Sequence, residues 1–150
     1  MKGKDAGPSR ELFEAVGALI MTASAVDQQV AFQILRFISP VDVVFFHAWP
    51  VVAGMDFRVK LTLIRTLASR HGKEVRDWIV ECCDKMQALY QRRNQIAHSV
   101  FTGVSRGGRA RFVTFNADSQ TGSPRRPLVV TPKQIHEWAQ ELFVWGNELE

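Results

Sequence analysis

Residues 9–38 read SRELFEAVGALIMTASAVDQQVAFQILRFI and form the longest regular pattern in the chain. Apolar residues recur in it at spacings of three and four, which is the period of an α-helix with one apolar face. The stretch therefore predicts a single long amphipathic helix whose apolar face is turned toward a core. The residues of that face are Leu12, Val16, Leu19, Ala23, Val26, Val30, Ile34 and Phe37.

A second helix is expected directly after the first. Ser39 and Pro40 form a helix-opening signal, because serine caps a helix start and proline suits the first helical position. Asp42 adds a negative charge to the first turn, as is common near a helix N-terminus. This helix is very apolar and is expected to stop near Trp49–Pro50.

Two more helices are expected before residue 98. Asp56 can cap a third helix, whose expected end is His71–Gly72 because glycine suits the left-handed position after a helix. A fourth helix is expected to begin near Glu74. Its apolar face is predicted to hold Val75, Trp78, Ile79, Cys82, Met86, Leu89, Tyr90, Ile96 and Ala97.

The period of the apolar residues changes from about 3.6 to about 2 at residue 100. Two short β-prone runs flank Gly107–Gly108, which predicts a β-hairpin over about residues 100–115. Residues 116–127 are rich in Ser, Gly and Pro and are expected to form a polar loop. The sequence TPKQ at 131–134 then opens a last helix, with Thr as the cap and Gln at the capping-box position.

These patterns together predict a mainly α fold, a five-helix bundle with a small β-hairpin inserted before the last helix. The 150 residues suit one domain, and we expect a flexible lead over residues 1–8 followed by a single domain over 9–150. Hydrophobic residues make up 46% of the chain and charged residues 23%, which excludes an intrinsically disordered protein. No uninterrupted apolar run reaches the ~20 residues of a membrane span, so no membrane partner is expected.

Cys82 and Cys83 are the only cysteines, and as neighbours in one helix they cannot easily form a disulfide with each other. They are expected to be buried thiols of a reduced, cytoplasmic protein. The sequence contains no GxxxxGK or GxGxxG loop, and its histidines and cysteines lack the HExxH and CxxC spacings. Neither a cofactor nor a metal site is therefore expected.

The net charge of +4 is concentrated in one stretch. Residues 92–126 contain seven arginines and a single acid, whereas the remainder of the chain has a net charge of −2. Arginine presents a planar fork of donors that matches phosphate, so one interpretation is nucleic-acid binding and the other is a solvated basic loop without a partner. The candidate nucleic-acid-binding residues are Arg92, Arg106, Arg109 and Arg111, beside Phe112 and Phe115, which either stack on bases or pack onto the bundle.

The end of the fourth helix, YQRRNQIAHS over residues 90–99, breaks the apolar pattern. Arg93 falls on the face that otherwise points toward the core, where an isolated charge would be prohibitively costly. It must therefore be paired, or must face a wet groove or a second subunit. Asn94 and His98 are four residues apart and share one helix face, and Gln91 extends that polar row.

Within this stretch, the hexapeptide RNQIAH from Arg93 to His98 resembles the R-x4–6-H motif of the HEPN superfamily, the higher eukaryotes and prokaryotes nucleotide-binding domains. In that family the arginine is followed by a polar residue, and the motif lies late in a long helix of an all-α bundle, as it does here. The resemblance covers residues 9–147, and the predicted hairpin is compatible with it.

The resemblance implies a metal-independent RNA endonuclease, of the kind often found as a toxin or defence factor. Such proteins act as homodimers in which two copies of the motif face each other across a composite cleft, and an antitoxin protein is a further implied partner. Carried over to this chain, Arg93 would hold the scissile phosphate, and His98 would be a general acid or base acting on the 2′-OH or the leaving oxygen. Asn94 would orient the phosphate or His98.

Two other interpretations remain open for the same residues. One is a non-catalytic module that binds RNA, a nucleotide or a protein partner in the same groove. The other is a purely structural dimeric domain in which Arg93 pairs with an acid such as Asp27, while Asn94 and His98 bond the helix end and the hairpin. In an ideal helix Arg93 and His98 are about 140° apart around the axis, so they converge only where the helix ends or bends, or across a dimer.

Overall fold

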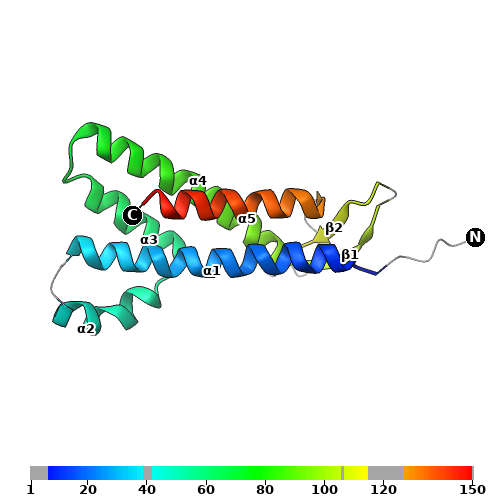
Figure 1. The fold of residues 1–150 in the computed structure, drawn as a ribbon, viewed down its shortest axis with the longest axis horizontal. Coiled ribbons are helices and arrows are strands. Elements are labelled where there is room, and N and C mark those ends of the chain that lie inside the picture. The colour runs from blue at the N-terminus through cyan, green and yellow to red at the C-terminus, as the bar shows by residue number, and fades with distance from the viewer. Residues whose placement is uncertain (1–6, 39–41, 106, 115–126, 150) are drawn as a thin grey trace, which may run out of the picture. The chain divides into compact units, whose positions relative to one another are not determined.

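The computed structural model describes residues 7–38, 42–105, 107–114 and 127–149, and of residues 42–46 the backbone alone. The fold is mainly α, with five helices and a small antiparallel three-strand sheet before the last helix (Figure 1). The predicted fold class is confirmed. The elements are α1 (Arg10–Ile38), α2 (Asp42–Ala53), α3 (Phe57–Ala68), α4 (Lys73–Ala97), β1 (Val100–Val104), β2 (Ala110–Val113), β3 (Leu128–Val130) and α5 (Pro132–Asn147).

Three helices begin with side-chain caps, of which those of α3 and α5 were predicted. Ser9 Oγ accepts a hydrogen bond from a backbone N–H in the first turn of α1 at 3.2 Å. Asp56 Oδ1 accepts the N–H of Arg58 at 2.9 Å and caps α3. At α5, Thr131 and Gln134 form a reciprocal capping box, with N–H to side-chain oxygen distances of 2.9 and 3.1 Å.

The second helix is longer than expected. α2 runs through Pro50 to Ala53 instead of stopping at Trp49–Pro50. Proline removes only its own N–H from the helical ladder, and the Pro50 carbonyl still accepts a hydrogen bond from Gly54 N–H at 3.2 Å. The start expected at Ser39–Pro40 lies outside the described residues.

The third helix is shorter than expected. α3 ends at Ala68, and Ser69 with φ −60° and ψ −17° caps it without any left-handed residue, so the end predicted at His71–Gly72 is wrong. Gly72 has no positive φ, and its carbonyl accepts a hydrogen bond from Arg76 N–H at 3.0 Å. The glycine therefore opens α4 and does not end α3.

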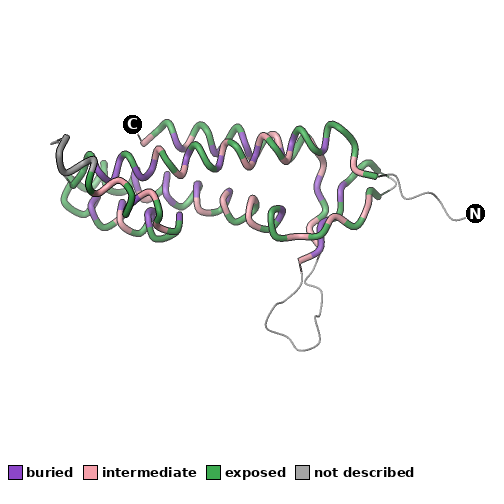
Figure 2. Tube along the Cα trace, turned by 90° about the horizontal axis from the view of Figure 1, so that it is seen from below, coloured by how far each residue is buried: buried purple, intermediate pink, exposed green. Residues whose placement is uncertain are grey.

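The described residues form two compact units, each assembled from separate parts of the chain. The sheet unit comprises residues 1–21 and 91–140, and the helical unit comprises residues 22–90 and 141–150. Buried and exposed residues follow one another along each helix, as amphipathic helices require (Figure 2). The prediction of a single domain over residues 9–150 stays a prediction.

The sheet unit has a hydrophobic core in which the first part of α1, the end of α4 and the first part of α5 pack against the sheet. Leu12, Ala15 and Leu19 come from α1, and Ile96 comes from the end of α4. The remaining buried members come from the sheet and α5, and are Ala110, Phe112, Val130, Ile135 and Ala139.

The sheet has the order β1-β2-β3, which makes it larger than the predicted hairpin. Gly107–Gly108 forms the turn between β1 and β2 as predicted, and Gly108 adopts the left-handed φ of 71° that glycine tolerates. The additional strand β3 pairs antiparallel with β2 and continues directly into the cap of α5. Its three residues are too few to show an alternating pattern, so the sequence period did not reveal it.

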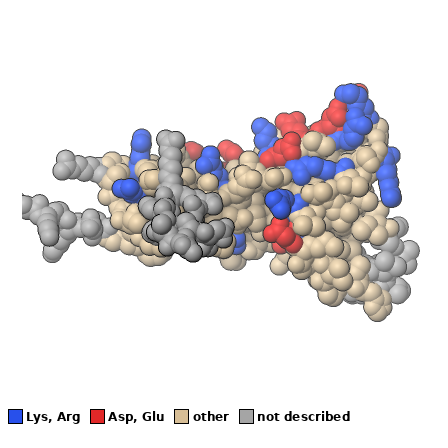
Figure 3. Space-filling view, turned by 180° about the vertical axis from the view of Figure 1, so that it is seen from behind, with Lys and Arg blue, Asp and Glu red and all other residues tan. Residues whose placement is uncertain are grey.

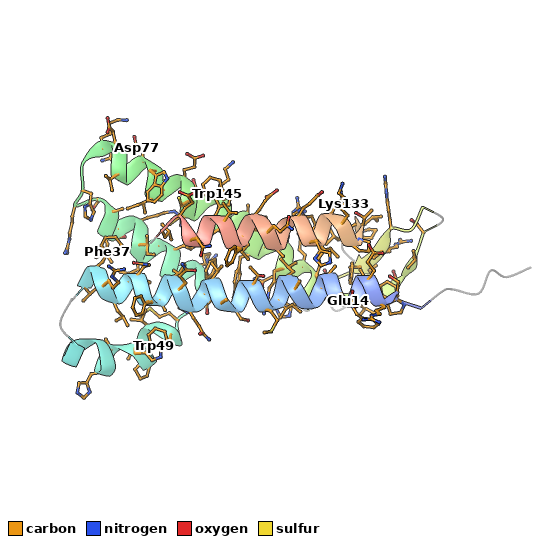
Figure 4. All side chains as sticks on the ribbon, in the orientation of Figure 1. Glu14, Phe37, Trp49, Asp77, Lys133 and Trp145 are labelled. Carbon is orange, nitrogen blue, oxygen red and sulfur yellow. The ribbon has the colours of Figure 1, made fainter. Side chains whose placement is uncertain are left out.

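Within the helical unit the buried side chains come from all five helices. Gly146 on α5 is in close contact with Val26 on α1, because a Cβ at this position would lie 2.8 Å from Val26 Cγ2. Trp145 beside it, labelled in Figure 4, has the Lys85 ammonium 6.0 Å from its ring centroid. The fully buried apolar residues include Val30, Ile34, Leu61, Ile64, Cys82, Cys83, Met86 and Leu142.

Four residues assigned to apolar faces are exposed. Phe37 and Val75 are 38% and 48% exposed, Trp78 is 41% exposed, and Ala97 is also on the surface. Periodicity identifies which face of a helix is apolar, but it does not show how far along that face neighbouring elements reach. Phe37 makes its own surface contact, since its ring meets the edge of His71 with 5.6 Å between centroids.

The helical unit also contains a buried ion pair. Lys60 on α3 is fully buried, and its Nζ donates to Asp27 Oδ1 at 2.8 Å and to the carbonyl of Ala53 at 2.9 Å. The pairs Arg65–Asp84 and Lys73–Asp77, each 2.6 Å, are more exposed. Acidic and basic side chains are neighbours on the surface that Figure 3 shows.

α1 is long and apolar enough to cross a membrane on length and composition alone, since its 18-residue window has a mean hydropathy of 1.2. α1 nevertheless contains no uninterrupted apolar run of ~20 residues, because Glu14 and Asp27 lie within it. The expectation that the protein has no membrane partner stays a prediction. A core helix passes the same test, and α1 supplies buried residues to both units, with 33% of the window buried.

Burial makes both thiols poor nucleophiles. Removal from water, the largest cause at each site, raises the pKa of Cys82 and of Cys83 from 9.0 to about 11.

At pH 8 we expect neither thiol of the folded protein to react with a disulfide reagent at an appreciable rate, whereas unfolding in denaturant should make both thiols reactive. Because their folded pKa values are raised, these thiols contribute stability below pH 9 that is lost as the pH rises toward 11. Rapid labelling of either thiol in the folded protein at pH 8 would show that Cys82 or Cys83 is accessible to solvent and would contradict this prediction.

Candidate functional site

A pocket of about 670 Å³ lies in the sheet unit, between the last turns of α4 and strand β3. We refer to it as the α4–β3 pocket. Its volume is within the range of about 300–1,000 Å³ that is typical of small-molecule sites. The lining residues are Gln91, Arg92, Asn94, Gln95 and His98 from the α4 side, Thr114 after β2, and Pro127, Leu128 and Val129 from the β3 side.

The α4 wall is one helix face, because residues separated by three, four and seven positions lie above one another. Gln91, Asn94 and His98, which were predicted to form a polar row, all line the pocket. The helix ends at Ala97, and His98 N–H closes its last turn by donating to the Asn94 carbonyl at 3.0 Å. His98 thus follows the helix in an exposed turn at the edge of the pocket.

Arg93 is not among the lining residues that the structure describes, so the predicted trio of Arg93, Asn94 and His98 is only partly brought together. Adjacent helical residues point about 100° apart, which turns Arg93 away from the face that Asn94 occupies. Its Nη1 nevertheless donates to Asn94 Oδ1 at 2.9 Å. This bond fixes the orientation of the Asn94 amide, which is left with its NH₂ group to offer the pocket.

The acid proposed as a structural partner for Arg93 is engaged elsewhere. Asp27 lies in the helical unit, where its Oδ1 accepts the hydrogen bond from Lys60. Arg93 belongs to the sheet unit and is half-buried there. The spacing of residues in the sequence did not show that Asp27 pairs with Lys60 and not with Arg93.

Among the described residues that line the pocket, Arg92 is the one arginine. Its guanidinium lies over Trp138 of α5, with 5.7 Å between Cζ and the ring centroid, and donates to Gln95 Oε1 at 3.4 Å. A guanidinium held against an aromatic ring loses little further conformational freedom when it binds an anion. The contact with Trp138 was not expected from the sequence, because the two residues are far apart along the chain.

Of the other candidate arginines, the structure describes Arg111 and Arg109. Arg111 on β2 is exposed and lies directly opposite Val129 of β3, a residue of the pocket wall. Arg109 is exposed at the start of β2, and Arg106 lies outside the described residues. Residues directly opposite in an antiparallel pair project on the same face, so Arg111 stands beside the pocket.

Phe112, the described one of the two candidate stacking residues, does not offer a stacking surface. Phe112 is 6% exposed and packs edge-on against Phe101 with 5.9 Å between centroids. Base stacking on Phe112 is therefore excluded in this fold, and the interpretation that it packs onto the bundle is confirmed. Phe115 lies outside the described residues.

Sequence reasoning missed the β3 wall and two polar lining residues. Gln95 and Thr114 line the pocket, and Thr114 Oγ1 lies 2.9 Å from Ser99 Oγ. A usable signal did exist, since the run Leu128-Val129-Val130 is rich in β-branched residues and directly precedes a helix cap. No pattern of neighbouring residues in the sequence could show that this strand lies next to α4.

The unit that holds the pocket also holds the positive charge of the chain. Its segments contain 11 basic and 5 acidic residues, a net charge of +6, whereas those of the helical unit contain 8 and 10, a net charge of −2. No acidic residue is among the pocket-lining residues that the structure describes. Among the same described residues, no three His, Cys, Asp or Glu side chains gather as a metal site requires.

Comparison with protein-family models gives no match, and comparisons with curated proteins and with solved structures find no significant similarity. The chain is therefore assigned to no family. What the structure establishes is a mainly helical five-helix domain with a small three-strand sheet.

Proposed function

We propose that this protein is a HEPN-like, metal-independent RNA endonuclease that acts as a homodimer, in the manner of toxin and defence ribonucleases. The observation that carries the proposal is the convergence of His98, Asn94 and Arg92 on one pocket free of acidic lining residues among those described. These side chains offer a proton-transfer group, an amide donor and a fixed cation, which are the groups that phosphodiester cleavage by a 2′-OH needs.

The chemistry assigned to these groups is an internal transesterification. The 2′ oxygen forms a bond to phosphorus, the bond from phosphorus to the 5′ oxygen breaks, and the product carries a 2′,3′-cyclic phosphate. The 2′ proton must be removed and the departing oxygen must gain one. His98 performs one of these two transfers, and the second copy's His98 or water performs the other, while Arg92 stabilises the negative charge on the phosphoryl oxygens.

The direct test is incubation of the purified protein with end-labelled structured RNA in the presence of a chelator. Cleavage that leaves cyclic-phosphate ends is expected, and its survival in chelator would match a mechanism that needs no divalent metal. Analytical ultracentrifugation on the same preparation tests the homodimer. If RNA is bound but never cut under any of these conditions, the endonuclease proposal is wrong.

The position of Arg93 gives a prediction that separates two adjacent arginines. Because Arg93 bonds Asn94 and does not line the pocket, we expect it to act through Asn94 as a positioning residue. Arg93→Met should lower kcat roughly tenfold, the effect of losing a charge-assisted hydrogen bond, with little change in KM, whereas Arg92→Met should lower kcat and also raise KM, because Arg92 contacts the phosphate itself.

A double-mutant cycle checks this assignment. The double variant Arg93→Met, Asn94→Ala should cleave RNA no more slowly than Asn94→Ala alone, because Arg93 acts only through its hydrogen bond to the Asn94 side chain, which Asn94→Ala already removes. The matched Arg92→Met change in the Asn94→Ala background should add its full effect. Additive loss in the Arg93 pair would show that Arg93 contacts the substrate itself.

One observation favours binding without cleavage as the second candidate. Three amide side chains, from Gln91, Asn94 and Gln95, line the pocket, a set better suited to recognition than to proton transfer. Such a module would bind RNA with a log affinity that falls linearly with log salt concentration and would show no turnover. Its natural partners would then be RNA, a nucleotide or an antitoxin protein.

A further inference from the structure

We propose that the α4–β3 pocket accepts one unpaired nucleotide of single-stranded RNA, with the adjoining phosphates bound by Arg92 on one side and Arg111 on the other. The inference rests on the proposed action on RNA and specifies the form of RNA that the site takes. It makes the protein selective for loops, bulges and single strands over continuous duplex.

The two walls of the pocket match the two kinds of surface on a nucleobase. The α4 wall carries the amides of Gln91, Asn94 and Gln95, each of which has donor and acceptor atoms. Arg93 already donates to the Asn94 oxygen and Arg92 to the Gln95 oxygen, so the NH₂ groups of these two amides are the atoms left for a base. The β3 wall carries Pro127, Leu128 and Val129, which are apolar. A base has a hydrogen-bonding edge and apolar faces, so it can meet the amides with its edge and the β3 wall with a face.

This arrangement requires an unpaired base. In a duplex the Watson–Crick edge is already occupied and the faces are stacked on neighbouring bases, so neither surface is available to the pocket. The major groove of an RNA helix is moreover too deep and narrow for side chains to enter. A single strand presents the edge and the face together, and the pocket volume of about 670 Å³ suits a ligand of nucleotide size.

Two arginines flank the position of the base. Arg92 lines the α4 side and is held over Trp138, while the exposed Arg111 lies on β2 directly opposite the β3 residue Val129. A strand that places one base in the pocket therefore has an arginine near the phosphates on each side. Both arginines belong to the unit with the net charge of +6, which favours the approach of a polyanion.

The test measures binding of a short, unstructured 2′-O-methyl RNA carrying a fluorescent label, which cannot be cleaved because it lacks the 2′-OH nucleophile. Fluorescence anisotropy compares this single strand with the same strand annealed to its complement. We expect the single strand to bind at least roughly tenfold more tightly, since each stacked or edge-recognised base contributes about that factor.

Two matched valines test the β3 wall. Val129 and Val104 are 43% and 38% exposed on the two outer strands of the sheet, but only Val129 lines the pocket. Val129→Asp should weaken single-strand binding more than tenfold by placing a negative charge against the base and its phosphates, whereas Val104→Asp should change it less than twofold. Arg111→Gln should reduce the slope of log affinity against log salt by about 0.7, the value for one phosphate contact on a single strand.

The outcomes distinguish this inference from the proposed function. Equal or tighter binding of the duplex, or equal effects of Val129→Asp and Val104→Asp with single-strand binding intact, would overturn the inference and leave the action on RNA standing. Failure of the wild-type protein to bind either RNA at low salt would overturn both. Circular dichroism of each valine variant confirms that its fold is retained, and both valines are exposed enough to make that retention expected.

Discussion

His98→Ala is expected to reduce RNA cleavage by a factor on the order of 100 to 10,000, the contribution typical of a positioned general acid or base. The side chain stands in the turn that follows α4, at the edge of the α4–β3 pocket and accessible to a phosphodiester. Its removal leaves Arg92 to bind the phosphate, so affinity for RNA should change far less than kcat does.

The fold should be retained in this variant. The His98 backbone N–H closes the last turn of α4, and alanine keeps that bond, while the imidazole itself is exposed. The free energy of unfolding is therefore expected to stay within about 0.5 kcal/mol of the wild type. His47→Ala is a matched control, since His47 is also exposed but belongs to the helical unit.

The measurement is a single-turnover rate on end-labelled RNA for the wild type, His98→Ala and His47→Ala. Undiminished cleavage by His98→Ala would remove this residue from the mechanism. Equal loss in both variants would point to an effect on the fold or to a contaminating nuclease.

Asp27→Ala is expected to destabilise the folded state by about 3–5 kcal/mol, the largest single effect on stability that we anticipate. The change leaves the Lys60 ammonium buried without its counter-charge, and the Ala53 carbonyl is then its hydrogen-bond acceptor among the described residues. An unpaired buried charge is costly because the low-polarity interior cannot replace the water that solvated it. Asp27 itself is 25% exposed, so water reaching its position should hold the loss toward the lower end of this range.

The Arg65–Asp84 pair offers a matched control on the same helix α3. Its nitrogen–oxygen distance of 2.6 Å is even shorter than the 2.8 Å of Lys60–Asp27, but Asp84 is 65% exposed. Asp84→Ala should therefore cost at most about 1 kcal/mol, because the remaining Arg65 guanidinium is partly exposed to water and keeps its hydrogen bond to Gln87 Oε1. The comparison isolates burial as the cause, since both variants remove an acid from an ion pair.

Urea unfolding of the two variants measures both free energies. Adding Lys60→Met to Asp27→Ala should recover most of the lost stability, since replacing both partners of a buried pair by apolar groups is often nearly neutral. Equal costs for Asp27→Ala and Asp84→Ala would contradict the account of Lys60 as a buried charge that depends on Asp27.

Local sequence was sufficient for most helices, because their signals lie within a few residues of one another. The apolar spacing of α1, the Asp56 cap and the Thr131–Gln134 capping box each act over about one helical turn and are present in the structure as predicted. The errors occurred where two local signals compete. Pro50 and Gly72 each suggested a helix end, but intact hydrogen bonds around them carried α2 onward and opened α4.

The candidate site was predictable only along α4. The helical period places Gln91, Asn94 and His98 on one face, and all three line the pocket. The same period places Arg93 about 100° from Asn94, yet their hydrogen bond depends on a side-chain conformation that no spacing specifies. Strand β3 was missed because three residues are too few for an alternating pattern.

Helix positions, caps and the concentration of arginine follow from the amino-acid sequence, since each depends on neighbours in the chain. The opposite wall of the pocket, the stacking of Arg92 on Trp138 and the choice of Lys60 as the partner of Asp27 come from the tertiary structure. Each of these joins residues 29 or more positions apart, and among many possible long-range pairs only the packing of the whole core selects one.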